Sequence, residues 1–170
     1  VVKPQGDPAT AAMLAAALRI SPVLANLLVQ RGIDTVEKAD KFFKPNLADL
    51  HDPFLMKDMD KAVERVERAV RDHEKIMVYG DYDVDGCTAV ALVYKFLRQI
   101  GHKNLMFYIP DRYTEGYGIS VKGIDLAARK GVGLIIALDC GIKATEKVVY
   151  AKTKGVDFII CDHHLPAEEI

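Results

Sequence analysis

Cysteine is scarce in this sequence of 170 residues, long apolar runs are lacking, and neither sign of charge dominates. The three cysteines, Cys87, Cys140 and Cys161, have neither CxxC nor zinc-finger spacing, which argues against a disulfide framework and a structural zinc site. We therefore expect a protein of the reducing cytoplasm. Without an apolar run of about 18 residues or a recognisable secretory signal, the sequence predicts neither a membrane span nor export.

The formal net charge is −1 at pH 7, which argues against a generally basic nucleic-acid binder. The second half of the chain is more informative. From residue 76 onward, 11 Lys and Arg stand against 12 Asp and Glu, and five of these acids are aspartates that we assign below to a metal cluster. Setting them aside leaves 11 basic against 7 acidic residues, so this half would become mildly electropositive with metal bound.

The first 75 residues are predicted to be helical. Asp7-Pro8 and Ser21-Pro22 each place a capping residue before a proline at the first helical position, and Thr35 opens a third, shorter helix. From Met59 to His73, apolar residues recur at spacings of three and four, which is typical of an amphipathic helix. We therefore predict an N-terminal helical segment over residues 1–75, without chemistry of its own.

From residue 76 the pattern changes to alternating strands and helices. Short apolar runs predict strands over residues 76–79, 105–109, 134–138 and 158–160, and the helices between them end at glycines. This alternation predicts an α/β fold over residues 76–170, with a parallel sheet built from right-handed βαβ units. Ligands of such open sheets bind beyond the carboxyl ends of the strands.

Acidic residues follow every predicted strand. They are Asp81, Asp83 and Asp85 after the first, Asp111 with Arg112 after the second, Asp139 after the third, and Asp162 with His163 and His164 after the fourth. Carboxylates gathered at one edge repel one another, so a divalent cation is expected among them. Oxygen and imidazole ligands suit Mn²⁺ and in part Mg²⁺, and two such ions can promote hydrolysis of a phosphate ester.

Each of these signals has a simpler interpretation when taken alone. Asp85 could be an ordinary helix N-cap, Asp139 a turn residue, and the two histidines a surface pair. The DxDxDG motif also occurs in calcium-binding loops, but an EF-hand needs Glu at its twelfth position, where this chain has Leu92. The combination of the motifs, each after a strand, favours the metal site.

The motifs together closely resemble the DHH phosphoesterase superfamily. The matching segments are Gly-Asp-Tyr-Asp-Val-Asp-Gly at 80–86, Ile-Pro-Asp-Arg and Glu-Gly-Tyr-Gly within 109–118, Leu-Asp-Cys-Gly at 138–141 and Asp-His-His at 162–164. The similarity runs from about Leu28 to the end, and it is strongest to the branch that degrades single-stranded DNA. That branch implies 5′ to 3′ hydrolysis with Mn²⁺ or Mg²⁺, in recombination and repair.

The resemblance also implies roles for individual residues. It implies that Asp83, Asp85, Asp139 and His163 are metal ligands, with Asp81 as an additional or supporting acid. By the same resemblance, Asp162 is the supporting carboxylate and His164 binds phosphate or stabilises the transition state. Arg112 is a candidate phosphate contact, although it could equally form a salt bridge at the sheet edge.

One departure from the superfamily pattern concerns the end of the chain. The superfamily has a further acidic ligand and a second domain after the Asp-His-His motif, whereas this sequence stops six residues beyond it. We therefore expect the N-terminal portion of a longer protein, in which repair and recombination proteins could be recruited by the missing part.

Two other functions remain open at this point. One is a superfamily member that hydrolyses short oligonucleotides or cyclic dinucleotides, but such members usually carry His where this chain has Tyr79, four residues before Asp83. The other is a scaffold that binds DNA without cleaving it, which should have lost some of the acids or histidines. Both features favour the exonuclease.

Overall fold

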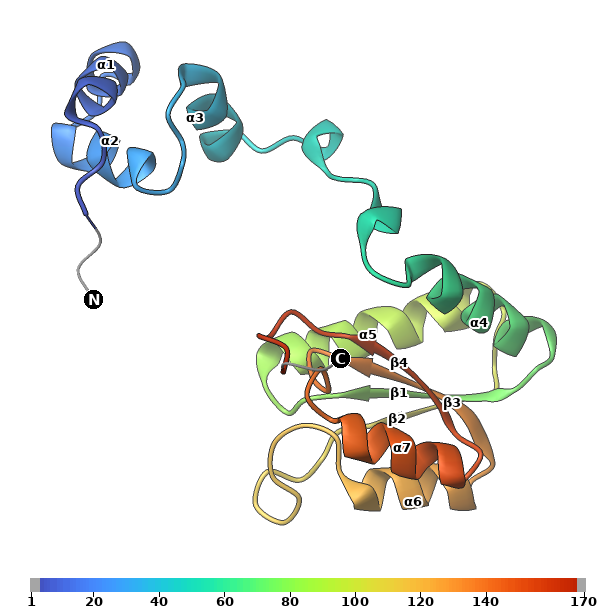
Figure 1. Cartoon of the computed structure of the whole chain (residues 1–170). Coiled ribbons are helices and arrows are strands. Elements are labelled where there is room, and N and C mark those ends of the chain that lie inside the picture. Colours follow the sequence, from blue (N-terminus) through green and yellow to red (C-terminus); the bar gives the residue numbers. More distant parts are fainter. Residues whose placement is uncertain (1–3, 168–170) are drawn as a thin grey trace. The chain divides into compact units, whose positions relative to one another are not determined.

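The computed structural model describes residues 4–167, and Figure 1 shows the chain coloured along its sequence. Contacts group the chain into two compact units, with the boundary between Leu55 and Met56. The two predicted domains, 1–75 and 76–170, include residues 1–3 and 168–170, which lie outside the described part. No helix of the described part is long and apolar enough to cross a bilayer.

The first unit consists of short helices whose starts are fixed by side-chain caps. Its helices are α1 (Pro8–Leu18), α2 (Pro22–Val29) and α3 (Val36–Phe43), followed by the 3₁₀ turns η1 (Leu47–Asp49) and η2 (Pro53–Leu55). The side chains of Asp7, Ser21 and Thr35 accept hydrogen bonds from backbone N–H groups three residues later, as the sequence predicted. Leu14 and Leu28 lie in the small core of this unit.

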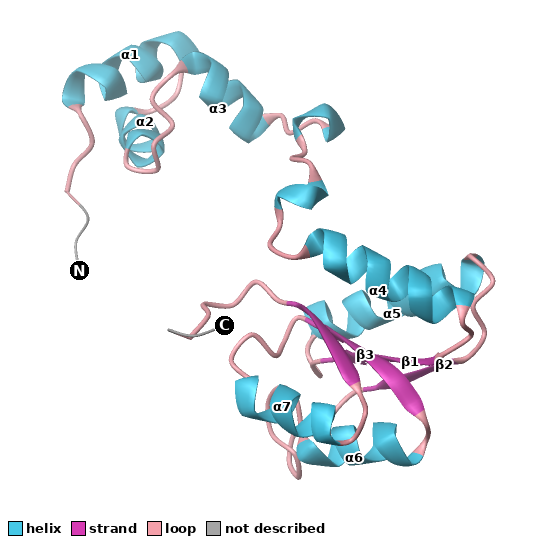
Figure 2. Cartoon of the chain, turned by 45° about the vertical axis from the view of Figure 1, so that its right-hand side comes forward, coloured by secondary structure: helices cyan, strands magenta, loops and turns pink. Residues whose placement is uncertain are grey.

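The second unit is a four-stranded parallel sheet with helices on both faces (Figure 2). In chain order its elements are α4 (Met59–Arg71), β1 (Lys75–Gly80), α5 (Val84–Gln99), β2 (Leu105–Tyr108), α6 (Val121–Arg129), β3 (Val132–Leu138), α7 (Thr145–Thr153) and β4 (Asp157–Cys161). The strand order is β2-β1-β3-β4. The predicted α/β class and parallel sheet are confirmed.

Alternating side chains of the central strands build a core on each face of the sheet. Ile76 and Val78 of β1 point to the face covered by α4 and α5, whereas Met77 and Tyr79 point to the face covered by α6 and α7. Ala69 of α4 is fully buried in the first of these cores. Helix α4 therefore packs on the sheet, although the sequence-based division placed it in the N-terminal segment.

The side chain of Arg65 fixes α4 to the amino ends of the strands. Its Nε donates to Asp157 Oδ2 at 2.7 Å, and its Nη2 donates to Glu74 Oε2 at 2.7 Å and to the Gly133 carbonyl at 3.2 Å. Because the side chains of Arg65 and Glu74 are 13% and 28% exposed, their ion pair is weakly screened by water, whereas Asp157 is half exposed.

We predict that Arg65→Ala lowers the free energy of unfolding by about 2 to 3 kcal/mol, because Glu74 and Asp157 lose a shared, partly buried partner. Urea denaturation would measure the change. Lys61→Ala, which breaks an exposed pair between α4 and its N-cap residue Asp58, is the matched control and should shift the midpoint little. Equal shifts for the two variants would contradict the role given to Arg65.

Candidate functional site

The candidate site lies at the carboxyl edge of the sheet. Asp81 follows β1, Asp139 follows β3, and Asp162 to His164 follow β4, so parallel strands bring these residues to one edge. The chain passes from β1 to β2 on one side and returns across β1 to β3 on the other. The connections that leave β1 and β3 therefore run in opposite directions along the sheet. Open α/β sheets bind ligands at such a switch point, beyond the carboxyl ends of the two strands.

Two glycines allow α5 to begin directly against the end of β1. A Cβ on Gly86 would lie 2.5 Å from the Asp81 carbonyl oxygen, and a Cβ on Gly80 would lie 2.4 Å from Val90 Cγ2. The helix cap in this turn is Asp83, whose Oδ1 accepts the Gly86 N–H at 2.9 Å. Asp85 lies in the first turn of the helix and is exposed, so the possibility that Asp85 is the N-cap is wrong.

Asp81 is the buried acid of this turn. It is only 1% exposed, and its Oδ1 has no hydrogen-bond partner among the described residues. Burial raises the pKa of Asp81, and the negative charges of Asp83 and Asp139 raise it further. A buried carboxylate oxygen without a donor calls for a positive partner.

Asp139 and the histidine pair lie close enough to share a ligand. His163 Nε2 is 3.0 Å from Asp139 Oδ1. Asp139, His163 and His164 each offer one potential metal-ligating atom, and these three atoms lie within 4.8 Å of one another. Asp139 has a left-handed backbone (φ +59°), and its N–H donates to the Cys161 carbonyl at 2.8 Å. Asp81, Asp83 and Asp85 do not belong to this group of donor atoms in the described part of the chain.

Asp162 orients His164 and is itself fully engaged. Its Oδ1 lies 2.7 Å from His164 Nδ1, and its Oδ2 accepts the Ile142 N–H at 2.9 Å. Burial acts to raise the pKa of Asp162, but these hydrogen bonds bring it below its usual value. The hydrogen bond with Asp162 in turn raises the pKa of His164, which favours the imidazolium.

The loop after β2 brings aromatic residues to the same edge. The Arg112 guanidinium lies 5.2 Å from the centre of the Tyr82 ring and forms no ion pair with the described residues. The Tyr117 hydroxyl donates to the Asp139 carbonyl at 3.3 Å and lies 3.3 Å from His164 Nε2. Sequence reasoning assigned no role to Tyr117, because its partners are 22 and 47 residues away. The one local signal is the pair of glycines that flank it.

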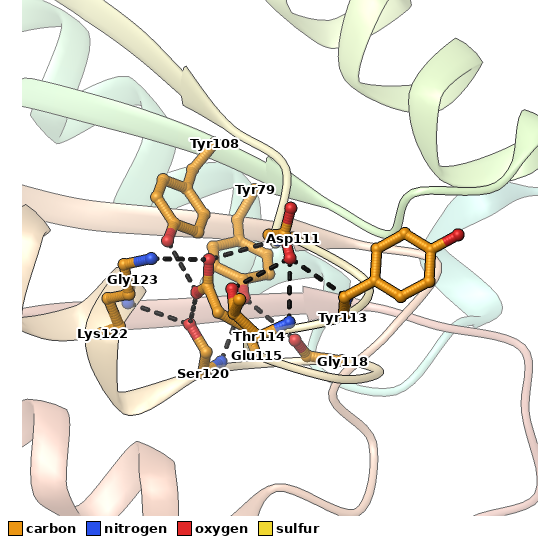
Figure 3. Close-up of polar contacts among 10 residues, drawn as sticks. All are labelled: Tyr79, Tyr108, Asp111, Tyr113, Thr114, Glu115, Gly118, Ser120, Lys122 and Gly123. Carbon is orange, nitrogen blue, oxygen red and sulfur yellow. Dashed lines mark hydrogen bonds and ion pairs between the residues drawn. The ribbon is translucent and has the colours of Figure 1, made fainter.

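A buried carboxylate holds this loop together (Figure 3). Glu115 Oε2 accepts hydrogen bonds from Tyr108 Oη at 2.7 Å and Ser120 Oγ at 2.6 Å, and Oε1 accepts the Asp111 N–H at 3.1 Å and pairs with Lys122 at 3.4 Å. Burial acts to raise the pKa of Glu115, but these donors outweigh it and lower the pKa to about 2. Glu115 is therefore ionised at neutral pH.

Comparison with known proteins agrees with this geometry. The profile described as "DHH family, N-terminal domain" matches residues 75–170. The chain belongs to the DHH family. It is 44% identical over 153 residues to the single-stranded-DNA-specific exonuclease RecJ of Bacillus subtilis (strain 168), a match that covers 90% of this chain and 19% of that protein. With RecJ of Escherichia coli (strain K12) it shares 33% identity over 152 residues, which covers 89% of this chain and 26% of that protein.

Two solved structures of RecJ are also similar to this chain. A crystal structure of exonuclease RecJ bound to manganese matches with a TM-score of 0.61 and 32% identity, covering 66% of this chain and 29% of that one. RecJ from Thermus thermophilus in complex with Mn²⁺ matches with a TM-score of 0.67 and 27% identity, covering 97% of this chain and 22% of that one. The chain therefore spans about a fifth to three tenths of the length of these relatives.

We predict that Glu115 stabilises the fold in a pH-dependent way. Because folding depresses its pKa from 4.5 to about 2, the stabilisation is fully present above pH 4.5 and is lost as the pH falls toward 2. The melting temperatures of the wild type and Glu115→Gln should therefore differ clearly at about pH 5.5 and converge near pH 2.5. Glu67→Gln, at an exposed position of α4, is the control and should change little at either pH. A gap that widens toward low pH would contradict this assignment.

Proposed function

We propose that this chain carries the metal-binding part of an exonuclease that hydrolyses single-stranded DNA from 5′ to 3′ in recombination and repair. The observation that carries the proposal is the convergence of Asp81, Asp139, Asp162, His163 and His164 on one sheet edge of a DHH-family domain. Relatives named as single-stranded-DNA-specific exonucleases support the substrate class. A cytoplasmic location, inferred from cysteine usage, stays a prediction, as do protein partners in repair.

The residues present fit a site for Mn²⁺ or Mg²⁺. The buried Asp81 Oδ1 lacks a hydrogen-bond donor, and at the same sheet edge Asp139, His163 and His164 bring one carboxylate and two imidazoles together, a mixed set that suits Mn²⁺ and in part Mg²⁺. We propose that Asp83, Asp85, Asp139 and His163 bind the metal, with Asp81 as a further ligand or support. Two divalent ions at such a site would lower the pKa of a water and neutralise charge on the phosphoryl group.

The chain's own side chains would orient the DNA phosphate. Asp162 holds the His164 ring through Nδ1 and favours its protonated form, so the Nε2–H of His164 can donate a hydrogen bond to a phosphate oxygen. Arg112, which stacks on Tyr82 and has no acidic partner among the described residues, would contact a phosphate. The alternative role of Arg112, a salt bridge at the sheet edge, is not seen within residues 4–167.

The alternatives are less well supported. The Tyr79 side chain is fully buried, and its hydroxyl donates to the Gly118 carbonyl at 2.9 Å and accepts the Ser120 N–H at 3.0 Å. It cannot replace the histidine that members acting on short nucleotides use at this position. A non-catalytic scaffold would have no need to keep Asp81 buried without a hydrogen-bond donor, because that arrangement costs stability unless a cation is bound.

We predict that the chain binds Mn²⁺ and that Asp139→Asn weakens binding roughly tenfold or more, because the amide keeps the shape of the side chain but loses its charge. Isothermal titration calorimetry would measure the affinity. Asp60→Asn, which changes an exposed residue of α4, is the matched control and should bind Mn²⁺ as tightly as the wild type does. Equal affinity of wild type and Asp139→Asn would remove Asp139 from the site.

We further predict that the full-length protein with Mn²⁺ degrades 5′-labelled single-stranded DNA much faster than the blunt duplex of the same sequence. Its affinity for DNA should fall as salt rises. Asp139→Asn should abolish cleavage, and Asp60→Asn should not. Equal rates on both substrates would reject the single-strand exonuclease and leave a general phosphoesterase.

A further inference from the structure

Tyr117 is held at the site by the loop that carries it. It lies between Gly116 and Gly118, both with left-handed backbones (φ +77° and +80°) that other residues rarely adopt. These turns aim its ring at the edge of the sheet, where its hydroxyl meets the Asp139 carbonyl and the His164 ring. The ring is also packed edge-on against Tyr82, with the centroids 6.4 Å apart. The position of this one side chain therefore affects two residues of the proposed site.

Two buried side chains hold the loop of residues 111–118 in place. One is the Tyr79 hydroxyl, which binds the carbonyl of Gly118 directly after Tyr117. The other is Glu115, which precedes Tyr117 by two residues and whose side chain is 5% exposed. Figure 3 shows both anchors side by side, with the Tyr113 ring pointing away from them.

Glu115 connects both ends of the loop to the sheet and to α6. Its donors come from three places: Tyr108 at the end of β2, Asp111 at the start of the loop, and Ser120, which is the N-cap of α6. Its backbone N–H also donates to the Asp111 carbonyl at 2.9 Å, which closes the loop on itself. Arg112 lies inside this closed segment, so its place over Tyr82 depends on the same anchor.

We propose that Glu115 is a positioning residue, which fixes the loop 111–118 so that Tyr117 and Arg112 meet the reacting phosphate in register with Asp139 and His164. Glu115 touches none of the proposed metal ligands and acts only through the loop. The effect on DNA cleavage rests on the proposed function, whereas the effect on the loop does not. This role was not evident from sequence.

Glutamine cannot replace Glu115 in this arrangement. All four of its partners present a hydrogen toward the carboxylate, so it must accept at both oxygens. An amide keeps one acceptor and turns an NH₂ group toward the other donors. Glu115→Gln is therefore close to wild type in volume but loses the charge-assisted bonds at one oxygen.

The first test measures loop order without any need for activity. Arg112 is exposed and offers trypsin a single cleavage site within the loop, and the peptide ending at Arg112 can be followed by mass spectrometry. We expect Glu115→Gln to speed this cleavage about tenfold or more, because local opening becomes easier. Cleavage after Arg31, which is exposed and lies in the other unit, is the internal reference. Glu67→Gln is the matched control and should match the wild type.

The second test uses the full-length protein with Mn²⁺ and single-stranded DNA. We expect Glu115→Gln to lower kcat by about tenfold to a hundredfold and to raise KM, because misplacement of about 1 Å at a reacting centre has effects of this size. Its affinity for Mn²⁺ should stay within about twofold of the wild type. Asp139→Asn should show the opposite pattern, with weak Mn²⁺ binding and an unchanged rate of cleavage after Arg112.

The positioning role would be overturned if Glu115→Gln were cleaved after Arg112 at the same rate as the wild type and had the same kcat and KM. Should that variant fail to fold, Tyr108→Phe removes only one donor to the carboxylate and should give a smaller increase in the same cleavage. No increase in Tyr108→Phe would also overturn the role. If the wild type does not cleave DNA, the proposed exonuclease function is wrong. The positioning role of Glu115 is then still decided by the comparison of trypsin cleavage after Arg112.

Discussion

The close approach of α5 to the end of β1 is the constraint on which the site depends. No side chain fits at residue 86, because a Cβ there would lie within 2.5 to 2.8 Å of the Asp81 backbone. The helix can therefore begin three residues after Asp81, with Asp83 as its cap. Asp81 remains buried at the end of the strand while Asp83 and Asp85 are exposed, so the backbone presents one buried acid and two exposed acids before any cation contributes.

The buried acids of this region differ in how their charge is satisfied. Asp162 and Glu115 accept several hydrogen bonds, which bring the pKa of each below its ordinary value despite burial. Asp81 is as deeply buried, yet one of its oxygens has no donor among the described residues, and its pKa is raised. The first two acids serve to hold a histidine and a loop. Of the three, Asp81 is the one whose carboxylate keeps an oxygen without a hydrogen-bond donor among the described residues.

Much of the fold was predictable because the signals are local. Buried strands appear as short apolar runs, and proline, serine and glycine mark the starts and ends of helices. The helices, the strands and the position of the acidic residues at the carboxyl edge of the sheet therefore followed from the sequence. The sequence did not show that Asp83 rather than Asp85 caps α5, because the three alternating acids are equivalent candidates until backbone packing selects one. The place of α4 on the sheet depends on Arg65, whose partner Asp157 is 92 residues away. Tyr117 and Glu115 likewise gain their roles only through contacts with other strands and loops.

The two edges of the sheet handle charge in opposite ways, and this contrast supports a ligand at one of them. At the amino edge, Arg65 lies between Glu74 and Asp157, so the acids there are paired within the fold. At the carboxyl edge, His163 pairs with Asp139 and His164 with Asp162, whereas Asp81, Asp83 and Asp85 form no ion pair with the described residues. A fold selected only for stability would pair these acids as it pairs those at the other end, since uncompensated charges in one place repel one another. The surplus of negative charge at the edge where open sheets bind ligands therefore supports the metal site proposed above.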